Sequence, residues 1–185
     1  MLIEEKTFQL KDGRTALIRS PRDEDIPGML EYLYVTSGET EFLLRYPEEC
    51  GKYTPEGEKA LFDRVNASPN EVMPVCLVDG KIAGNCMLSW PMGIKTRHRA
   101  SVAIAVKKEY WGLGIGTKLM EEMISVAESV PEILQIELEY IEGNARARRL
   151  YEKMGFRITG VRPDAIRLKD GTLLNEYSMM RKLER

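Results

Sequence analysis

The sequence predicts one domain of the mixed α/β (α+β) class, residues 1–185, with helices packed on a single β-sheet. Segments with strand-like and helix-like apolar patterns follow one another in the order β-α-α-β-β-β-α-β-α-β-β. The length of 185 residues suits one domain, and an apolar content of 43% suffices for its core. No internal repeat or linker divides the chain.

The first half of the chain is expected to contain a strand, two helices and a β-hairpin. These elements are a strand at 15–19, a helix that opens at 21–25, a helix at 55–67, and strands at 74–78 and 81–89. The dipeptide Asp79-Gly80 tolerates the positive φ angles of a two-residue hairpin turn, so it is expected to join the last two strands. Residues 36–54 show no clear pattern.

The second half alternates strands and helices more regularly. The expected elements are strands at 100–106 and 133–140, helices at 116–129 and 144–154, and final strands at 156–161 and 175–181. Pro131 is expected to end the first of these helices, since proline cannot continue a helical hydrogen-bond ladder. A turn at Asp170-Gly171 separates the last two strands.

Composition argues against several classes of function. Lysine and arginine total 27 and aspartate and glutamate 29, so the net charge of −2 argues against a nucleic-acid-binding protein. Three cysteines and one histidine are too few for a structural zinc cluster or a disulfide scaffold to be expected. No apolar run reaches membrane-spanning length, and the start lacks a basic segment followed by an apolar one. We therefore expect a reduced, soluble, cytoplasmic protein without a metal or a membrane partner.

A glycine-rich segment, Trp111 to Thr117, lies between an expected strand and an expected helix. Glycines let backbone amides turn toward one point, and the following helix N-terminus adds partial positive charge, which together suit a pyrophosphate. The spacing fits neither the P-loop pattern GxxxxGK[ST] nor the dinucleotide pattern GxGxxG. A glycine-rich turn without a ligand is an equally good reading of the segment by itself.

A second segment, residues 138–156, contains an expected helix with a clear apolar face. Ala147, Leu150, Tyr151 and Met154 fall on one side, while Asn144 can cap the first turn. Taken singly, Asn144 reads as a cap and Tyr151 as a core aromatic residue.

Together the two segments resemble the GNAT superfamily of N-acetyltransferases. The family pattern [QR]xxGxG corresponds to residues 111–116, preceded by the strand that ends Ile104-Ala105-Val106. The family stretch NxxAxxLYxxxGF is filled at every position by Asn144, Ala147, Leu150, Tyr151, Gly155 and Phe156. One departure is Trp111, where the family usually has glutamine or arginine, and this puts one side-chain contact in doubt.

The resemblance implies a mixed sheet that splays between the two strands holding acetyl-CoA, which end at Val106 and Tyr140. A backbone amide near Val106 would polarise the thioester carbonyl, and Tyr151 would protonate the departing thiolate. Arg146, Arg148 and Arg149 lie on the polar side of their helix, and one of them is expected to reach a coenzyme phosphate, with Arg148 taken as the candidate. The implied coenzyme-binding residues are Ile104, Ala105, Val106, Trp111, Gly112, Leu113, Gly114, Ile115, Gly116, Thr117, Asn144, Arg148 and Tyr151.

Glu139 is the candidate general base. An amine with a pKa of ~10 is mostly protonated at neutral pH, so it must lose a proton before it attacks. Glu137 and Glu139 share the strand face opposite Ile136, Leu138 and Tyr140, and Glu139 matches the glutamate proposed as base in related ribosomal-protein N-terminal acetyltransferases. An ordinary solvated strand face explains both glutamates equally well.

The expected function is acetyl-CoA-dependent N-acetylation of a primary amine, either a small molecule or a protein N-terminus. Cys76 and Cys86 lie in expected strands and read as core thiols, so the amine attacks directly without an acyl-cysteine intermediate. The alternative is a non-catalytic acyl-CoA-binding sensing module. A homodimer is compatible with the sequence. A basic run of Lys95, Arg97, His98 and Arg99 reads as a solvated loop, or as a contact to an acidic substrate or to adenosine phosphates. The acceptor loops are expected within residues 21–54 and 90–99, where the sequence carries no recognisable code.

Overall fold

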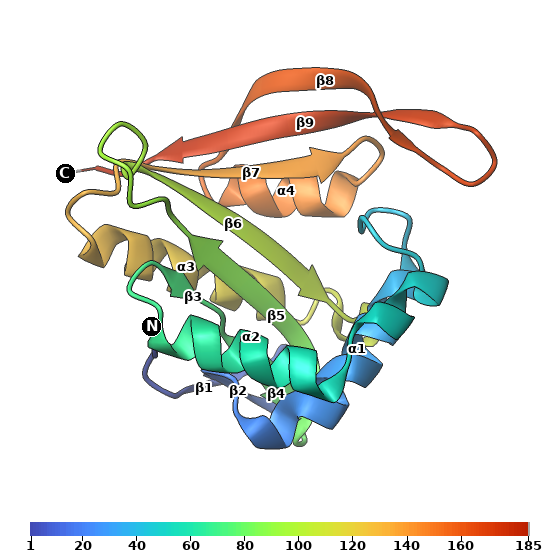
Figure 1. Ribbon diagram of the computed structural model, residues 1–185, viewed down its shortest axis with the longest axis vertical. Helices are drawn as coiled ribbons and strands as arrows, with labels where there is room; N and C mark the ends of the chain where they lie inside the picture. Colours follow the sequence, from blue (N-terminus) through green and yellow to red (C-terminus); the bar gives the residue numbers. More distant parts are fainter. Residues whose placement is uncertain (185) are drawn as a thin grey trace.

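The computed structural model describes residues 1–184, which form a nine-stranded sheet with helices on both faces (Figure 1). The strands are β1 Lys6–Gln9, β2 Thr15–Arg19, β3 Glu71–Val72, β4 Val75–Val78, β5 Lys81–Ser89, β6 Arg99–Val106, β7 Gln135–Ile141, β8 Arg157–Arg167 and β9 Leu173–Lys182. The helices are α1 Ile26–Glu39, α2 Pro55–Ala67, α3 Ile115–Ser129 and α4 Ala145–Lys153. Short 3₁₀ segments span Asp23–Asp25, Pro47–Lys52 and Lys108–Tyr110.

The sheet divides into two parts that meet at β6 and β7. Its strand order is β1-β2-β4-β5-β6-β7-β9-β8, with β3 added beside β5, and the neighbours are antiparallel except for the parallel pair β6 and β7. That parallel pair joins only Arg99–Ser101 to Gln135–Glu137. Beyond Ser101 the two strands diverge, as Figure 1 shows. The predicted splay is therefore confirmed.

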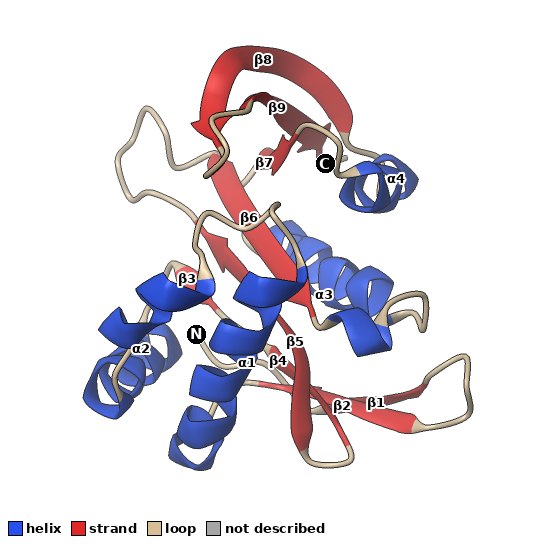
Figure 2. Cartoon of the chain, turned by 90° about the vertical axis from the view of Figure 1, so that its right-hand side faces the viewer, coloured by secondary structure: helices blue, strands red, loops and turns tan. Residues whose placement is uncertain are grey.

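The two faces of the sheet carry separate cores. One core holds the apolar stripe of α3, in which Leu119, Met120 and Met123 are completely buried against β5, β6 and β7. Burying each such side chain stabilises the fold by about 1.5–3 kcal/mol. The other core lies under α1 and α2, where Tyr32 and Phe62 are the largest buried side chains. Figure 2 shows α1 and α2 on one side of β6 and α3 on the other.

The structure differs from the sequence-based expectation mainly at exposed edges. β1 was not expected, because an exposed edge strand beside β2 shows no apolar alternation. The two-residue strand β3 was too short to register as a pattern. β8 extends to Arg167, well past the expected end at residue 161, because irregularities between Ile158 and Gly160 and between Arg162 and Ile166 interrupt its periodicity. α1 reaches Glu39 within the unassigned segment 36–54.

All three cysteines are free thiols, and two of them belong to the core. Cys50, Cys76 and Cys86 are unpaired, and Cys76 and Cys86 are fully buried core thiols, as expected. Burial raises the pKa of Cys76 to about 12, so this thiol stays protonated at neutral pH. Among residues 1–184, no group of three His, Cys, Asp or Glu side chains could hold a metal ion. Across that same range, every helix is too short or too polar to cross a membrane.

Candidate functional site

A cavity of about 830 Å³ opens where β6 and β7 separate. Its walls come from the two diverging strands, the 111–117 loop with the first turn of α3, the beginning of α4, and the segment that follows α1. Of the residues expected at the site, the cavity brings together Ile104, Ala105, Val106, Trp111, Gly112, Gly114, Ile115, Gly116, Thr117, Glu139, Asn144 and Tyr151. We call this cavity the cleft.

The edge of β6 offers backbone groups to the cleft that no neighbouring strand pairs. The Lys107 N–H donates to Ala83 O at 2.8 Å, so odd-numbered residues of β6 bond to β5 and even-numbered ones face away from it. The β6–β7 ladder ends at Ser101, which leaves the N–H and C=O groups of Ile104 and Val106 directed into the opening. An extended chain carrying amide groups can pair with such an edge as an added strand does.

The glycine-rich loop forms a cradle of backbone amides at the end of β6. Gly112 and Gly114 have φ angles of 80° and 105°, in the left-handed region that favours glycine. Gly114 is the N-cap of the fifteen-residue helix α3, whose first turn carries no acidic residue. A Cβ added at either glycine would have nothing within 4 Å, so the backbone there faces open space. This arrangement suits the phosphates of a ligand.

Gly116 has a different role in the same loop. A Cβ at this position would lie 3.1 Å from Leu150 Cδ2, because α3 and α4 approach each other closely here. Glycine at position 116 therefore lets α4, which lies on the β7 side of the cleft, pack closely beside the cradle. Leu113, which was expected to bind the ligand, does not line the cleft and packs instead against the main core.

Trp111, the departure from the family pattern, contacts both sides of the cleft, β6 on one side and α4 on the other. Its indole Nε1–H donates to Val106 O at 2.7 Å, on the side of β6 that faces the cleft. The Arg146 guanidinium, from the first turn of α4, lies 4.3 Å from the centre of the indole ring as a cation–π contact. Trp111 thus covers the last cleft-facing carbonyl of β6 and holds an arginine at the cradle.

Charges are separated along the cleft. Lys11, Arg146, Arg149 and Lys153 line it near the cradle, and Lys153 Nζ reaches Thr117 Oγ1 at 3.5 Å. Arg148, the expected phosphate contact, does not line the cleft and pairs with Glu152 at 2.8 Å on the exposed side of α4. Its two neighbours occupy the expected place instead, because helical geometry turns Arg148 outward.

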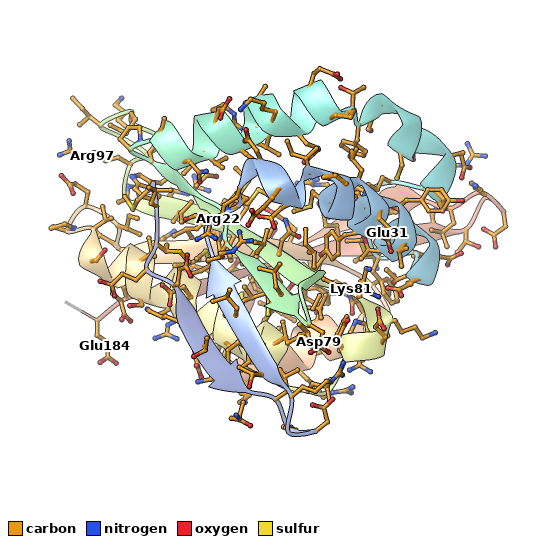
Figure 3. The ribbon with its side chains drawn as sticks, turned by 90° about the horizontal axis from the view of Figure 1, so that it is seen from below. Arg22, Glu31, Asp79, Lys81, Arg97 and Glu184 are labelled. Carbon is orange, nitrogen blue, oxygen red and sulfur yellow. The ribbon has the colours of Figure 1, made fainter. Side chains whose placement is uncertain are left out.

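The basic run before β6 lies far from the cradle. Ser101 at the start of β6 pairs with Ser89, whereas Val106 at its end pairs with Gly84, near the β4–β5 turn. Figure 3 shows Arg97 at one end of the molecule, away from Asp79 and Lys81 on that turn. The basic run is therefore not part of the cradle.

Asn144 and Tyr151 combine structural roles with positions in the cleft. Asn144 Oδ1 accepts the Ala147 N–H at 3.1 Å, which caps α4 as expected. The Tyr151 ring packs 6.4 Å from Tyr140 and 6.2 Å from Phe156, with 6% of the residue exposed. Burial raises the pKa of Tyr151, so its hydroxyl is protonated at neutral pH and is able to donate a proton.

Glu137 and Glu139 share a strand face but have different surroundings. Glu137 accepts two hydrogen bonds from Arg99, at 2.8 and 2.6 Å, and this guanidinium holds the pKa of the Glu137 carboxyl below its usual range. Glu139 is exposed and lines the cleft. The structure therefore separates the two carboxylates, and only Glu139 stands where a ligand of the cleft can reach it.

The end of α1 and the residues after it form a further wall of the cleft, within the range 21–54 where acceptor loops are expected, but no individual residue of this wall was predicted. Tyr32 donates from its hydroxyl to Ala105 O at 2.8 Å, and Glu39 Oε2 accepts the Lys108 N–H at 2.8 Å. Tyr32 and Thr36 continue the stripe of Met29 at the i+3 and i+7 positions, a signal that could have extended the helix. No local pattern marks residues 40–44 as part of a cleft.

Comparison with known proteins identifies the family. The model of the Acetyltransferase (GNAT) family matches residues 40–156, which is more than half of the chain and includes the cradle, both diverging strands and α4. The chain therefore belongs to the GNAT family of acetyltransferases.

Relatives and solved structures agree with this assignment. An L-amino acid N-acetyltransferase of Escherichia coli is 28% identical over 119 residues, covering 64% of this chain and 73% of that protein. An N-alpha-acetyltransferase of Sulfurisphaera tokodaii is 33% identical over 93 residues, 45% of this chain and 54% of its own.

Two solved structures share the fold. A GNAT-family acetyltransferase of Streptococcus pneumoniae superposes with a TM-score of 0.85 at 25% identity, covering 91% of this chain and 99% of that one. A putative acetyltransferase of Salmonella typhimurium, solved with its cofactor acetyl-CoA, gives a TM-score of 0.77 at 19% identity over 91% and 94% of the two chains. The mixed, splayed sheet is thus the GNAT fold.

Proposed function

We propose that this acetyltransferase, as one catalytic domain, transfers the acetyl group of acetyl-CoA to the nitrogen of a primary amine. The observation that carries the proposal is the cleft itself, in which an unpaired strand edge leads to a cradle of backbone amides. The cofactor of the Salmonella relative, acetyl-CoA, has phosphates that suit the cradle and amide groups that suit the edge of β6.

The charged side chains of the cleft support one orientation of the donor. The cations Lys11, Arg146, Arg149 and Lys153 favour the phosphates at the cradle end. The cleft-facing amides of Ile104 and Val106 are then available to hydrogen-bond the thioester carbonyl as negative charge develops on its oxygen. Acetyl-CoA supplies an activated acetyl group, and the protein supplies its position and the proton transfers.

Two side chains are suited to those proton transfers. Glu139 takes the proton that the ammonium must lose, directly or through a water molecule, before the nitrogen attacks the carbonyl carbon. A C–N bond forms, the C–S bond breaks, and the sulfur leaves as a thiolate, while the nitrogen loses its second proton, which replaces the one that Tyr151 gives up. The protonated hydroxyl of Tyr151 donates to that thiolate.

Direct attack agrees with the placement of the cysteines. Neither Cys76 nor Cys86 lines the cleft, and burial raises the pKa of both thiols. A nucleophilic cysteine requires an accessible thiolate. The acetyl group therefore passes to the amine without first moving to a cysteine.

A binding assay and a turnover assay test the proposal together. Acetyl-CoA at a hundred times its Kd should stabilise the protein by about 2.7 kcal/mol, seen as a rise in Tm. With a panel of primary amines, free coenzyme A should be released and the acetylated amine detected by mass spectrometry. Binding without turnover on any amine would indicate an acyl-CoA-binding sensing module, and the absence of both would refute the proposal.

A further inference from the structure

We propose that the acceptor is a small free amine without a neighbouring carboxylate, because a strap of residues 40–48 crosses the acceptor side of the cleft and adds an apolar wall to it. This inference rests on the proposed transfer to a primary amine and deepens it by naming the acceptor class. It chooses between the two acceptors that the sequence leaves open, a small molecule and a protein N-terminus.

The strap begins on the β6 arm of the cleft. Tyr32 and Glu39 fix the last turns of α1 to the backbone at Ala105 and Lys108, with donor–acceptor distances of 2.8 Å in both contacts. Arg45 Nη2 donates to Thr36 Oγ1 at 3.1 Å, which draws the middle of the strap back onto α1. One end of the strap is therefore held by hydrogen bonds to the strand arm that ends in the cradle.

The strap then crosses to the β7 arm. Phe42 packs against the turn between β7 and α4, where a Cβ added to Gly143 would lie only 3.5 Å from Phe42 Cε1. Phe42, Leu43 and Leu44 line the cleft between the two arms. This segment thus forms an apolar wall across the opening, on the sheet face that carries α1.

The far end of the strap is tied to the β8–β9 hairpin. The Lys169 N–H donates to the Tyr46 hydroxyl at 3.2 Å, and Lys169 Nζ lies 4.2 Å from the centre of the Tyr46 ring. Lys169 also forms an ion pair with Glu48. Figure 1 shows the segment after α1 on the same side of the molecule as the tip of this hairpin.

The strap also limits the size of the acceptor. The cleft of about 830 Å³ has to hold both the reacting end of the donor and the acceptor. Strap contacts next to the end of β6, on the turn between β7 and α4 and on the β8–β9 hairpin give the acceptor side an additional wall. A chain that continues beyond its own amine, such as a peptide, would have to pass Phe42 and Leu43, which line the cleft from the strap that Tyr46 anchors to Lys169.

Charge points to the same class of acceptor. The acidic side chains that line the cleft are Glu39, which accepts the Lys108 N–H, Glu139, and Glu176, which pairs with Arg162 at 2.7 Å. Glu39 and Glu139 stand on opposite arms and attract an ammonium. Among the described residues that line the acceptor side, none is cationic, and the nearby Arg45 guanidinium donates to Thr36. A short aliphatic diamine fits better than an α-amino acid, because its methylene groups match the apolar wall.

Steady-state kinetics with three acceptors test the inference. The probes are 1,4-diaminobutane, L-methionine and a trialanine peptide with a free N-terminus, each measured as kcat/KM at saturating acetyl-CoA. We expect the diamine to exceed the other two by at least about tenfold. In Phe42→Ala and Tyr46→Ala, the preference for the diamine over the peptide should narrow severalfold.

A matched variant and a binding measurement make the result decisive. Tyr34→Ala removes a tyrosine that is 59% exposed on α1 and outside the cleft, so it should leave all three ratios unchanged. Equal or better use of the peptide by the unaltered protein, or ratios unaffected by both strap variants, would overturn the inference while the proposed function stands. A preference for L-methionine would overturn its charge argument. Absence of turnover on every amine would overturn the proposed function as well.

Discussion

The cradle and the strap bound the same cleft but are built from different kinds of contact. The cradle is local, since its two positive φ angles, its helix cap and the indole contact to Val106 all lie within residues 106–115. The strap depends on distant partners, with a separation of 123 residues between Tyr46 and Lys169 and 73 between Tyr32 and Ala105. One half of the cleft is therefore set by backbone geometry and the other by long-range side-chain packing.

This difference predicts that the cradle and the strap have different functions. A cradle of main-chain amides recognises phosphates whatever the side chains nearby, so it suits a donor shared by a whole family. A wall of side chains can change without disturbing the cradle, so it suits an acceptor that differs between members. Substitutions in the cradle should abolish all activity, and substitutions in the strap should shift selectivity.

The largest effect is expected for Gly114→Asp. The substitution places a carboxylate at the N-cap of α3 and a side chain where φ is 105°. Like charges brought together cost several kcal/mol, so the Kd for coenzyme A should rise at least about 100-fold. Isothermal titration measures this loss. Gly80→Asp, at a turn with a φ of 73° and open space around it, carries similar backbone strain and should bind coenzyme A normally.

Tyr151→Phe should produce the next largest effect, on chemistry alone. It keeps the ring that packs against Tyr140 and Phe156 and deletes only the hydroxyl. We expect kcat to fall on the order of 10²-fold with coenzyme affinity and Tm nearly unchanged. A changed Tm with unchanged kcat would assign Tyr151 to packing only. Tyr177→Phe, on a ring stacked 5.2 Å from Tyr140 and outside the cleft, is the control.

The pH dependence sharpens the same test. Burial raises the pKa of Tyr151 above its ordinary value of 10, so the donor remains protonated throughout the neutral and mildly alkaline range. The kcat profile should therefore show no loss below about pH 10 that depends on Tyr151. Such a loss, removed by Tyr151→Phe, would contradict the buried, protonated state.

Glu139→Gln should lower kcat/KM at neutral pH by roughly tenfold or more, because glutamine cannot accept the ammonium proton. Raising the pH should restore part of the loss, since more of the amine is then already neutral. Glu137→Gln breaks the ion pair with Arg99 outside the cleft and should leave kcat/KM unchanged. Equal losses in both variants would replace the general base with general electrostatic attraction.

Trp111→Phe is expected to have the smallest effect on function. It removes one hydrogen bond and keeps an aromatic ring for Arg146, so the Kd for coenzyme A should change only a few-fold. The variant also provides a fluorescence test, because a ligand that pairs with the edge of β6 competes with the Trp111 indole for Val106 O. Tryptophan emission should change on binding in Trp90→Phe and should not change in Trp111→Phe.

The parts of the cleft that could be predicted from the sequence are those that local contacts determine. The strand to Val106, the glycine turn, α3 and α4 were predictable because periodicity, caps and glycine spacing are local signals. Even there, Arg148 and Leu113 turned out to lie outside the cleft, since a one-residue rotation of a helix or loop exchanges an inward side chain for an outward one.

The strap could not be predicted for a physical reason. Residues 40–46 have neither helical nor strand periodicity. Their positions are fixed by Gly143, which lies against Phe42, and by Lys169, which contacts Tyr46, and both partners come more than a hundred residues later in the chain. β1 and β8 were missed or shortened because edge strands lack a buried face. Polar edges and long-range packing leave no pattern in a single sequence.

The central claim is that acetyl-CoA occupies the cleft by pairing with the free edge of β6 and by filling the cradle. Hydrogen–deuterium exchange at residue resolution, with and without acetyl-CoA, tests it most directly. Binding of acetyl-CoA in this way should give new protection at the amides of Ile104 and Val106 and of residues 112–117, with β8 unaffected. Protection confined to other elements, or saturating binding with no change at Ile104, Val106 and the cradle, would contradict it.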